Sequence, residues 1–440
     1  MKKKILSLML AAALSLTVTG CGKAPAADAP AASTAQAAGG EKTIINVWAQ
    51  GGLEEEPLSQ IFKGIEEELG NVEIVFSNFP KQEQLDKLQV APAVGDTPDI
   101  VFMDYLQVPY YYTMGMVECI DDRVDGGLRA DLLPSVIDEC SYDGKLYALA
   151  HYESGLSFWA NKPMLEKAGV RIPTSYHDAW DRAEFEDALQ KLQDSGVEHP
   201  LYMRQNNPST LYFSYMPILR SFGGDFMDRE TMLTAGALNG ENTIKAYEYI
   251  SWLVEKGYVD PYVDYDDGFN VRRENALSLM GNYKYPEYYA ELGDDLILVP
   301  TPDMGEGVFT CSGSGVFFMT TAATERGVAD LAWEVMKRTM APDAVDLITD
   351  ANAAIPALRS VLAHKEGYQK GEKFYLYREQ LEDGISYLRP ITPAHMTNYT
   401  AVGDATTNIF LGADPTAELN NASHNVDEVI LENGWDHWIR

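Results

Sequence analysis

The chain has 440 residues, of which 46% are hydrophobic and 23% are charged, a composition typical of globular proteins. This length exceeds what one ordinary hydrophobic core supports, so we expect two or three domains. Acidic residues (66) outnumber basic ones (34), and the net charge of −32 argues against binding nucleic acid or an anionic membrane face through the protein surface itself.

The first residues have the pattern of a secretory signal, predicted to span residues 1–20. Lys2 to Lys4 precede an apolar core from Ile5 to Val18, which is too short to span a bilayer comfortably. Thr19-Gly20-Cys21 has the form of a bacterial lipobox, so we expect cleavage before Cys21 and lipidation of that cysteine. An ordinary signal peptide with an incidental cysteine is the alternative. Residues 21–41, rich in Ala, Pro, Ser and Gly, are predicted to be a flexible tether.

The remaining cysteines are Cys119, Cys140 and Cys311, and an odd number in an exported protein leaves at least one thiol free. Cys119 and Cys140 flank one segment and could pair, which the sequence leaves open. There is no CxxC pair and no His/Cys cluster, so we predict no metal site and no cofactor. The acidic stretch from Asp260 to Asn270 lacks EF-hand spacing and is predicted to be a solvated loop.

The folded part is predicted to begin near Lys42 with alternating strands and helices. Strands are expected at Thr43–Ala49, Val72–Phe76 and Asp99–Met103, and helices at Glu54–Leu69 and Gln82–Val94. In the second helix, the buried face is expected to hold Leu85, Leu88, Val90 and Val94. This alternation is typical of a parallel α/β sheet, in which ligands bind beyond the carboxyl ends of the strands.

That rule selects residues directly after the first and third strands as ligand-binding candidates. They are Trp48, Gln50, Gly51, Asp104 and Tyr105. Trp48 has a second interpretation as a buried core residue. Asp104 has a second interpretation as a helix N-cap.

A break in the hydrophobic pattern follows the turn signal Asp143-Gly144. An apolar run to Ala150 is interrupted at residues 151–153 and resumes from Leu156 to Trp159, and a helix opening at Asn161 ends at Gly169. Two short strands joined in this way suit a backbone crossing between two lobes. Two neighbouring strands of one sheet would give the same pattern.

Further elements follow the expected crossing. Helices are predicted at Asp178–Gln193, Leu211–Phe222, Glu241–Gly257, Arg326–Met340 and Phe374–Leu381, and strands at His199–Met203 and Asp295–Val299. Between them, Arg204, Asn206 and Asn207 offer planar donors and acceptors to hydroxyl groups of a ligand, although solvation in a loop explains them as well. No internal repeat is visible.

Several stretches resemble one family. DGKLYALA (143–150) and WANKPMLEKAGVRIPTSYHDAW (159–180) are similar to the corresponding runs of the extracellular solute-binding proteins of ABC importers, in the family that mostly binds sugars. GDTPDIVFMDY, ALSLMGNY and YLRPITPAHMTNY also resemble its motifs in the same order. The departures are mild, with Ala148 for the usual Gly and Ala150 for Pro. The resemblance extends from Ile44 to about Ile430.

The resemblance implies a type II periplasmic-binding-protein-like α/β fold, with two discontinuous lobes joined by hinge crossings. We expect lobe 1 to comprise residues 42–150 and 301–356, and lobe 2 residues 151–300 and 357–440. It also implies a monomer without enzymatic activity that is anchored outside the cell membrane by lipid alone. Such a protein would capture a mono- or oligosaccharide in the interlobe cleft and deliver it to the transmembrane subunits of an ABC permease.

The resemblance adds ligand-binding candidates to those after the strands. Tyr283 and Tyr399 match positions at which relatives place an aromatic ring, and Arg389 matches a cleft position. The complete set of candidates is Trp48, Gln50, Gly51, Asp104, Tyr105, Glu153, Asn207, Tyr283, Ser314, Arg389 and Tyr399. Ser314 lies among glycines that either let the backbone approach a ligand or form an ordinary turn.

A surface glycan hydrolase is the alternative function. It requires two carboxyl groups at a fixed separation across one bond, one of them with a raised pKa. No spacing in the sequence indicates such a pair, and the GxSxG motif of serine hydrolases is absent.

Overall fold

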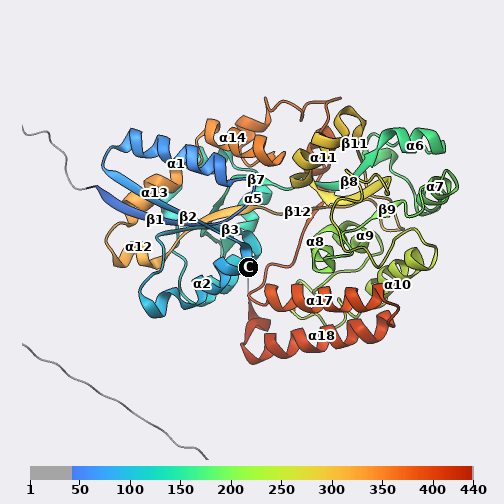
Figure 1. Cartoon of the computed structure of the whole chain (residues 1–440). Coiled ribbons are helices and arrows are strands. Elements are labelled where there is room, and N and C mark those ends of the chain that lie inside the picture. Colours follow the sequence, from blue (N-terminus) through green and yellow to red (C-terminus); the bar gives the residue numbers. More distant parts are fainter. Residues whose placement is uncertain (1–41, 439–440) are drawn as a thin grey trace, which may run out of the picture. The chain divides into compact units, whose positions relative to one another are not determined.

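The computed structural model describes residues 42–438. The predicted signal peptide (1–20), the lipidation of Cys21 and the tether (21–41) lie outside the described residues. The described chain forms two lobes, each built around its own sheet and covered by helices (Figure 1). The predicted two-lobe α/β fold is confirmed.

The first sheet has the strand order β2-β1-β3-β13-β6. Its strands are β1 (Thr43–Gln50), β2 (Val72–Phe79), β3 (Ile100–Asp104), β6 (Ala148–Ala150) and β13 (Gly315–Met319). The three strands predicted from the first hundred residues pair in parallel, whereas β13 runs antiparallel to both β3 and β6. The first four residues of β3 are buried, as expected for an apolar strand covered on both faces.

Helices α1 (Glu55–Leu69) and α2 (Lys81–Val94) connect the parallel strands. Helix α1 ends at Gly70, whose φ of 70° is the left-handed conformation that glycine adopts without a Cβ penalty. The predicted buried face of α2 is partly wrong, because Val90 is 57% exposed and Val94 is 71% exposed. The buried positions are instead Gln84, Leu85, Leu88 and Ala91. These positions are spaced i, i+1, i+4 and i+7 and so lie on one helix face, whereas the two valines lie off that face.

The chain leaves the first sheet after β6 and enters the second at β8 (Leu156–Asn161). The two apolar runs therefore lie in different sheets, and their interpretation as neighbours in one sheet is wrong. Between them, β7 (Tyr152–Glu153) pairs antiparallel with β14 (Ile355–Pro356), so two connecting segments support each other. The turn at Asp143-Gly144, with φ of 49° and 71°, joins β4 (Ser141–Tyr142) to β5 (Lys145–Leu146).

The second sheet has the order β11-β8-β10-β9. Its other strands are β9 (Leu201–Tyr202), β10 (Leu277–Gly281) and β11 (Leu296–Val299). Helices that follow in this part of the chain are α6 (Lys162–Ala168), α7 (Arg182–Asp194), α8 (Leu211–Ser214), α9 (Met216–Ser221), α10 (Glu241–Glu255) and α11 (Tyr285–Leu292). The helix predicted over residues 211–222 is thus two helices, with Pro217 in the first turn of the second one.

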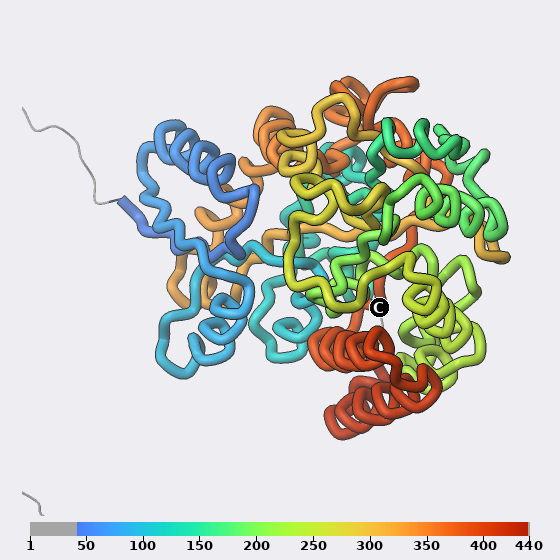
Figure 2. Tube along the Cα trace, turned by 45° about the vertical axis from the view of Figure 1, so that its right-hand side comes forward, coloured from blue at the N-terminus to red at the C-terminus, as the bar shows by residue number. Residues whose placement is uncertain are grey.

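The rest of the described chain adds a two-stranded sheet and most of the remaining helices. β12 (Thr310–Ser312) pairs in parallel with β15 (Ser386–Leu388). The helices are α3 (Val108–Thr113), α4 (Gly126–Asp131), α5 (Pro134–Glu139), α12 (Thr321–Glu325), α13 (Ala329–Arg338), α14 (Pro342–Asn352), α15 (Arg359–Leu362), α16 (Tyr375–Glu382), α17 (His395–Phe410) and α18 (Pro415–Glu432). The helix predicted over residues 326–340 begins later, at Ala329. Helices α17 and α18 pack side by side and form the lower part of the second lobe in the view of Figure 1, and they also lie side by side in Figure 2.

Two further observations concern the described part of the chain. None of its helices combines the length and the apolar composition needed to cross a membrane. Cys119 is an exposed free thiol, so it makes no disulfide with the buried Cys140.

Candidate functional site

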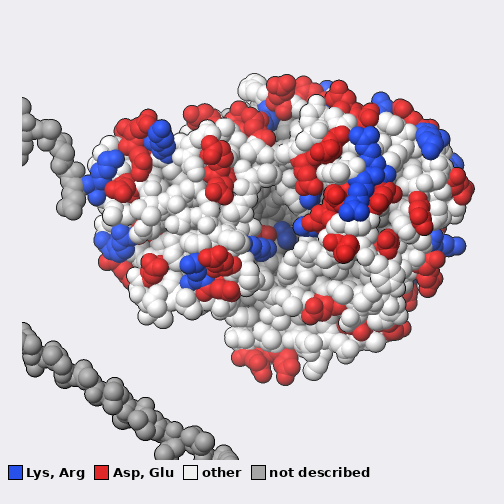
Figure 3. All heavy atoms as spheres, in the orientation of Figure 1, with Lys and Arg blue, Asp and Glu red and all other residues white. Residues whose placement is uncertain are grey.

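A cavity of about 550 Å³ lies between the two sheets. It is lined by the ends of β1 and β3, by the crossing that contains Tyr152, and by residues of the second lobe from the short helix η5 (Asn282–Lys284), α11 and α17. In the space-filling view this cavity is seen as a hollow, with lysine or arginine side chains at its rim and inside it (Figure 3). The rest of this face carries many acidic groups.

Glycines form the floor of the cavity at the start of β13. A Cβ on Gly315 would lie 2.5 Å from the Phe102 ring and 2.7 Å from the Tyr152 hydroxyl oxygen. Gly313 has a φ of 157°, and a Cβ there would lie 2.6 Å from the Tyr105 ring and 2.8 Å from the Arg389 guanidinium. Glycine is therefore required by close packing at these positions, and its absence of a side chain keeps the floor open.

Asp104 and Arg389 form the polar centre of the cavity. Asp104 Oδ1 accepts a hydrogen bond from the backbone N–H of Leu106 at 3.1 Å and so caps the short helix η1 (Tyr105–Gln107), as one of its two interpretations predicted. Asp104 Oδ2 lies 3.8 Å from Arg389 Nη2. Burial raises the pKa of the Asp104 carboxyl, but the charges of Arg389 and Lys81 outweigh it, and the net pKa is lowered.

Aromatic rings form part of the second-lobe wall. The Phe213 and Tyr283 ring centroids are 6.5 Å apart, and both side chains line the cavity together with Tyr399. Lys81 Nζ, which belongs to α2 of the first lobe, lies 5.4 Å from the centroid of the Tyr399 ring in α17. The cavity therefore presents apolar ring faces beside charged groups, which suits a ligand with both apolar faces and hydroxyls.

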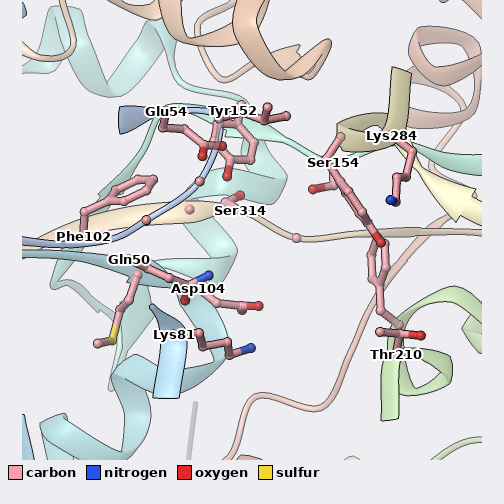
Figure 4. Close-up of a pocket in the computed structure, with 18 of the residues that line it drawn as sticks. Gln50, Glu54, Lys81, Phe102, Asp104, Tyr152, Ser154, Thr210, Lys284 and Ser314 are labelled. Carbon is pink, nitrogen blue, oxygen red and sulfur yellow. The ribbon is translucent and has the colours of Figure 1, made fainter. Parts of the chain in front are cut away.

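Two of the other cations in the cavity are paired with carboxylates. Arg204 Nη2 lies 3.3 Å from Asp266 Oδ2, and Lys284 Nζ lies 2.6 Å from Glu287 Oε2. Figure 4 shows Lys81 and Asp104 on one side of the cavity and Lys284 on the opposite side, with both ammonium groups directed into the space.

The structure brings seven of the eleven candidate residues to the cavity. They are Gln50, Gly51, Asp104, Tyr283, Ser314, Arg389 and Tyr399. Arg204 also lines the cavity. Asn206 lies outside the lining, where its side-chain amide donates a hydrogen bond of 2.8 Å to Asp266.

Four candidates lie away from the cavity, each for a local reason. Trp48 is half-buried and packs edge-on against Phe79 with 5.3 Å between ring centroids, so it packs against the core without being the fully buried residue of its second interpretation. Tyr105 is fully buried. Asn207 is exposed, and its carbonyl accepts a hydrogen bond from the Thr210 backbone.

Glu153, the fourth, is fully buried beside Glu139 and does not line the cavity. Burial raises the pKa of both carboxyls, and for Glu139 the neighbouring Glu153 raises it further. Glu139 Oε2 accepts a hydrogen bond from the Ser314 hydroxyl at 2.5 Å, which fixes that hydroxyl toward the interior. The Ser314 hydroxyl is thus engaged by Glu139, and Ser314 contributes to the cavity mainly through its backbone atoms.

Cavity residues that the sequence analysis missed include Glu54, Lys81, Phe213 and Lys284. Lys81 stands two residues after β2, but the sequence analysis ended this strand at Phe76 instead of Phe79, so the strand-end rule would not have reached Lys81. Glu54 comes from the loop after β1 and directs its Oε1 to Asn352 Nδ2 at 2.8 Å. Within residues 42–438, no group of three or more His, Cys, Asp or Glu side chains has an arrangement that could hold a metal ion.

Comparison with known proteins gives a family match and a fold match. Residues 51–337 match the model of the family described as bacterial extracellular solute-binding protein. A protein of Rhizobium meliloti (strain 1021) named "Probable sugar-binding periplasmic protein" is 24% identical over 253 residues, which cover 57% of each chain.

Two solved structures resemble the chain over most of its length. The GacH receptor of Streptomyces glaucescens, solved unliganded and with acarbose, has a TM-score of 0.75 at 19% identity, covering 89% of this chain and 99% of its own. An ABC substrate-binding protein of Listeria monocytogenes, in complex with cycloalternan, has a TM-score of 0.75 at 17% identity with the same coverage. These similarities concern the fold, and both solved structures are binding proteins.

Proposed function

Because this chain belongs to the family of bacterial extracellular solute-binding proteins, we propose that it captures a carbohydrate between its lobes and delivers it unaltered to an ABC permease. The observation that carries this proposal is the interlobe cavity, where the Tyr283 and Tyr399 rings stand beside Asp104, Gln50 and Arg389. Ring faces pack on the apolar faces of sugars, while the polar groups exchange hydrogen bonds with hydroxyls. A volume of about 550 Å³ is within the usual range for small-molecule sites.

The proposed mechanism is closure of two lobes around the ligand. We assign lobe 1 to residues 42–150 and 301–356, and lobe 2 to residues 151–300 and 357–440. The paired segments β7 and β14 are the proposed hinge. A ligand that touches both lobes binds the closed state more tightly than the open one, and this difference in affinity drives closure. Closure then presents the outer faces of the lobes to the permease.

The location follows from the predicted amino terminus. We propose that lipidated Cys21 holds a monomer at the outer face of the cytoplasmic membrane, and that residues 21–41 tether it there. Fluorescence labelling of intact cells and metabolic labelling with a radioactive fatty acid would test both points, with Cys21→Ala as the unlabelled control.

Hydrolysis of a glycan is the competing function, and the placement of the carboxyl groups disfavours it. Among the described residues, the carboxyls with raised pKa values are those of Asp99, Glu139 and Glu153, and none of the three lines the cavity. Asp104, which does line it, has a lowered pKa and is therefore a poor general acid.

A thermal-shift screen against mono- and oligosaccharides tests the proposal. We expect at least one saccharide to raise the melting temperature, since a ligand that binds only the folded state stabilises it. Chromatography of the saccharide after incubation should return it intact. Cleavage of the saccharide would support the hydrolase, and no stabilisation by any saccharide would contradict carbohydrate capture.

A further inference from the structure

The cations of the cavity differ in how they are neutralised. Four cationic side chains (Lys81, Arg204, Lys284 and Arg389) and three acidic ones (Glu54, Asp104 and Glu287) line it. Arg204 and Lys284 form ion pairs of 3.3 and 2.6 Å with carboxylates. Lys365, a buried lysine elsewhere in the fold, has two carboxylates within 2.7 Å. Pairing of this kind is the rule for buried charges.

Arg389 departs from this rule. Its side chain is 9% exposed, and Nε has no hydrogen-bond partner among the described residues. The one carboxylate beside it, Asp104, is 3.8 Å away, which is beyond hydrogen-bonding distance. The Arg389 side chain lines the cavity, with its guanidinium carbon 5.4 Å from the centroid of the Tyr105 ring and 4.9 Å from that of the Phe213 ring, and these rings accept no conventional hydrogen bond. An acceptor supplied from the cavity side would therefore satisfy donors that the described residues leave free.

Lys81 is the second exception. No ion pair or hydrogen bond joins its ammonium group to another described residue. The ammonium nitrogen lies 5.4 Å from the centroid of the Tyr399 ring, and the charges of Asp104 and Arg389 act on it from nearby. Figure 4 shows this side chain extending beside Asp104 into the cavity. Lys81, Asp104 and Arg389 thus form a cluster with one uncompensated positive charge.

From these contacts we propose that the cavity is built for a carbohydrate that bears a carboxylate, such as a uronic acid residue. Its carboxylate is bound jointly by Lys81 and Arg389. One carboxylate supplies the single negative charge that the cluster lacks, and its two oxygens match the planar guanidinium fork. This assignment rests on the proposed function and specifies the class of sugar.

The acidity of the whole protein does not oppose this assignment. The net charge of −32 is distributed over the chain, and at physiological ionic strength charges beyond about 8 Å are largely screened. Inside the cavity the groups in contact with the ligand dominate, and in the cluster of Lys81, Asp104 and Arg389 the uncompensated charge is positive. Of the other acidic groups in the lining, Glu287 is paired with Lys284, and Glu54 accepts a hydrogen bond from Asn352.

A matched pair of probes tests the assignment by calorimetry. The first probe is a mixture of short oligouronides, and the second is the same mixture after chemical reduction of its carboxyl groups to primary alcohols. We expect the acidic mixture to bind at least about tenfold more tightly than the reduced one, and its affinity to fall as salt is raised.

Lys81→Gln provides the decisive variant, with Lys87→Gln as the control on the same helix. Lys87 is exposed and lies outside the cavity lining. We expect Lys81→Gln to lose about tenfold in affinity for the acidic mixture and little for the reduced one, while Lys87→Gln keeps both affinities. Arg389→Lys retains the charge but removes the fork, and it should also weaken binding of the acidic mixture.

Melting curves without ligand show that each variant is folded. Equal affinity for the two mixtures, or an unchanged affinity in Lys81→Gln, would overturn the carboxylate assignment and leave carbohydrate capture standing. Tight binding of neutral saccharides without binding of the acidic mixture would likewise overturn the carboxylate assignment and leave carbohydrate capture standing. If no acidic or neutral saccharide binds, the proposed function fails together with this inference.

Discussion

Asp104 Oδ2 lies 3.8 Å from Arg389 Nη2, and this pair joins the carboxyl end of β3 to the segment that leads into α17. The two residues are 285 positions apart in the chain, yet both line one cavity. The charge of Asp104 partly compensates a buried guanidinium, and its other oxygen caps the helix η1. This pair therefore links local backbone structure, interlobe packing and the proposed ligand site.

Asp104→Asn should destabilise the folded protein without removing the cap, because the asparagine side-chain oxygen still accepts from Leu106. Loss of the negative charge leaves Arg389 without a counter-ion, at an expected cost of about 2 kcal/mol. Urea unfolding at pH 7 measures this cost. Asp187→Asn, which breaks an exposed pair with Lys191, is the control and should change stability by less than about 0.5 kcal/mol. Equal losses of stability in the two variants would show that the buried Asp104–Arg389 pair contributes no more to the free energy of unfolding than the exposed pair does.

Tyr283→Ala and Tyr399→Ala should each weaken saccharide binding while leaving the protein folded. Each ring lines the cavity and offers one stacking face, so we expect a loss of about 1 kcal/mol, or about fivefold in affinity, per substitution. Titration calorimetry with a saccharide identified in the screen measures the loss. Tyr262→Ala removes a ring that is 79% exposed and outside the cavity lining, and it should bind as the unsubstituted protein does. Unchanged affinity in both cavity variants would remove these rings from the site.

Glu153→Gln should stabilise the protein at alkaline pH and have little effect at acidic pH. Burial raises the pKa of Glu153 from 4.5 to about 7 in the folded state, so ionising this carboxyl costs more in the folded than in the unfolded chain. The cost is absent below about pH 4.5, increases as pH rises, and is complete above the folded-state pKa.

Chemical denaturation of Glu153→Gln and the unsubstituted protein at pH 4.5, 6 and 8 checks this pH dependence. We expect the variant to gain about 2 kcal/mol at pH 8, and this gain to vanish toward pH 4.5. A gain that is constant with pH, or one that is largest in acid, would contradict the raised pKa. Asp187→Asn, which breaks an exposed ion pair with Lys191, is measured in parallel as the surface control.

Gly155→Ala should disturb the crossing between the lobes. A Cβ at this position would lie 2.3 Å from the Tyr377 ring, and the Gly155 N–H donates to Asn282 Oδ1 at 3.0 Å. Such overpacking costs about 1–3 kcal/mol, which thermal unfolding would detect. The matched control is Gly64→Ala in the interior of α1, where a Cβ meets nothing within 4 Å. It should stabilise the protein by about 0.5–1 kcal/mol. Destabilisation by both, or by neither, would refute the packing argument.

The sequence predicted the fold because its signals were local and strong. Alternating apolar runs, left-handed glycines such as Gly70 and the break at residues 151–153 each depend on a few neighbouring residues. The errors arose where tertiary packing decided the outcome. Val90 and Val94 are apolar, yet the position of α2 on the sheet buries Gln84 and Ala91 instead. Gln84 is accommodated because its amide donates to the Phe102 carbonyl oxygen at 2.9 Å.

The site was less predictable than the fold because it is assembled from distant segments. Strand-end reasoning found Gln50, Gly51 and Asp104, and the family resemblance supplied Tyr283, Arg389 and Tyr399. Neither could show that Glu153 faces inward toward Glu139, because that orientation depends on groups far away in the sequence, in α5 and at Ser312-Gly313. The unpaired state of Lys81 is likewise a property of its three-dimensional surroundings and leaves no sequence signal.

The central claim is that a carbohydrate binds between the lobes, and a crystal structure of the protein saturated with a saccharide from the screen tests it most directly. The account predicts saccharide density in the interlobe cavity, in contact with Tyr283 and Tyr399 and within hydrogen-bonding distance of Arg389. Intact saccharide bound at another surface, with this cavity unoccupied by it, would contradict the account.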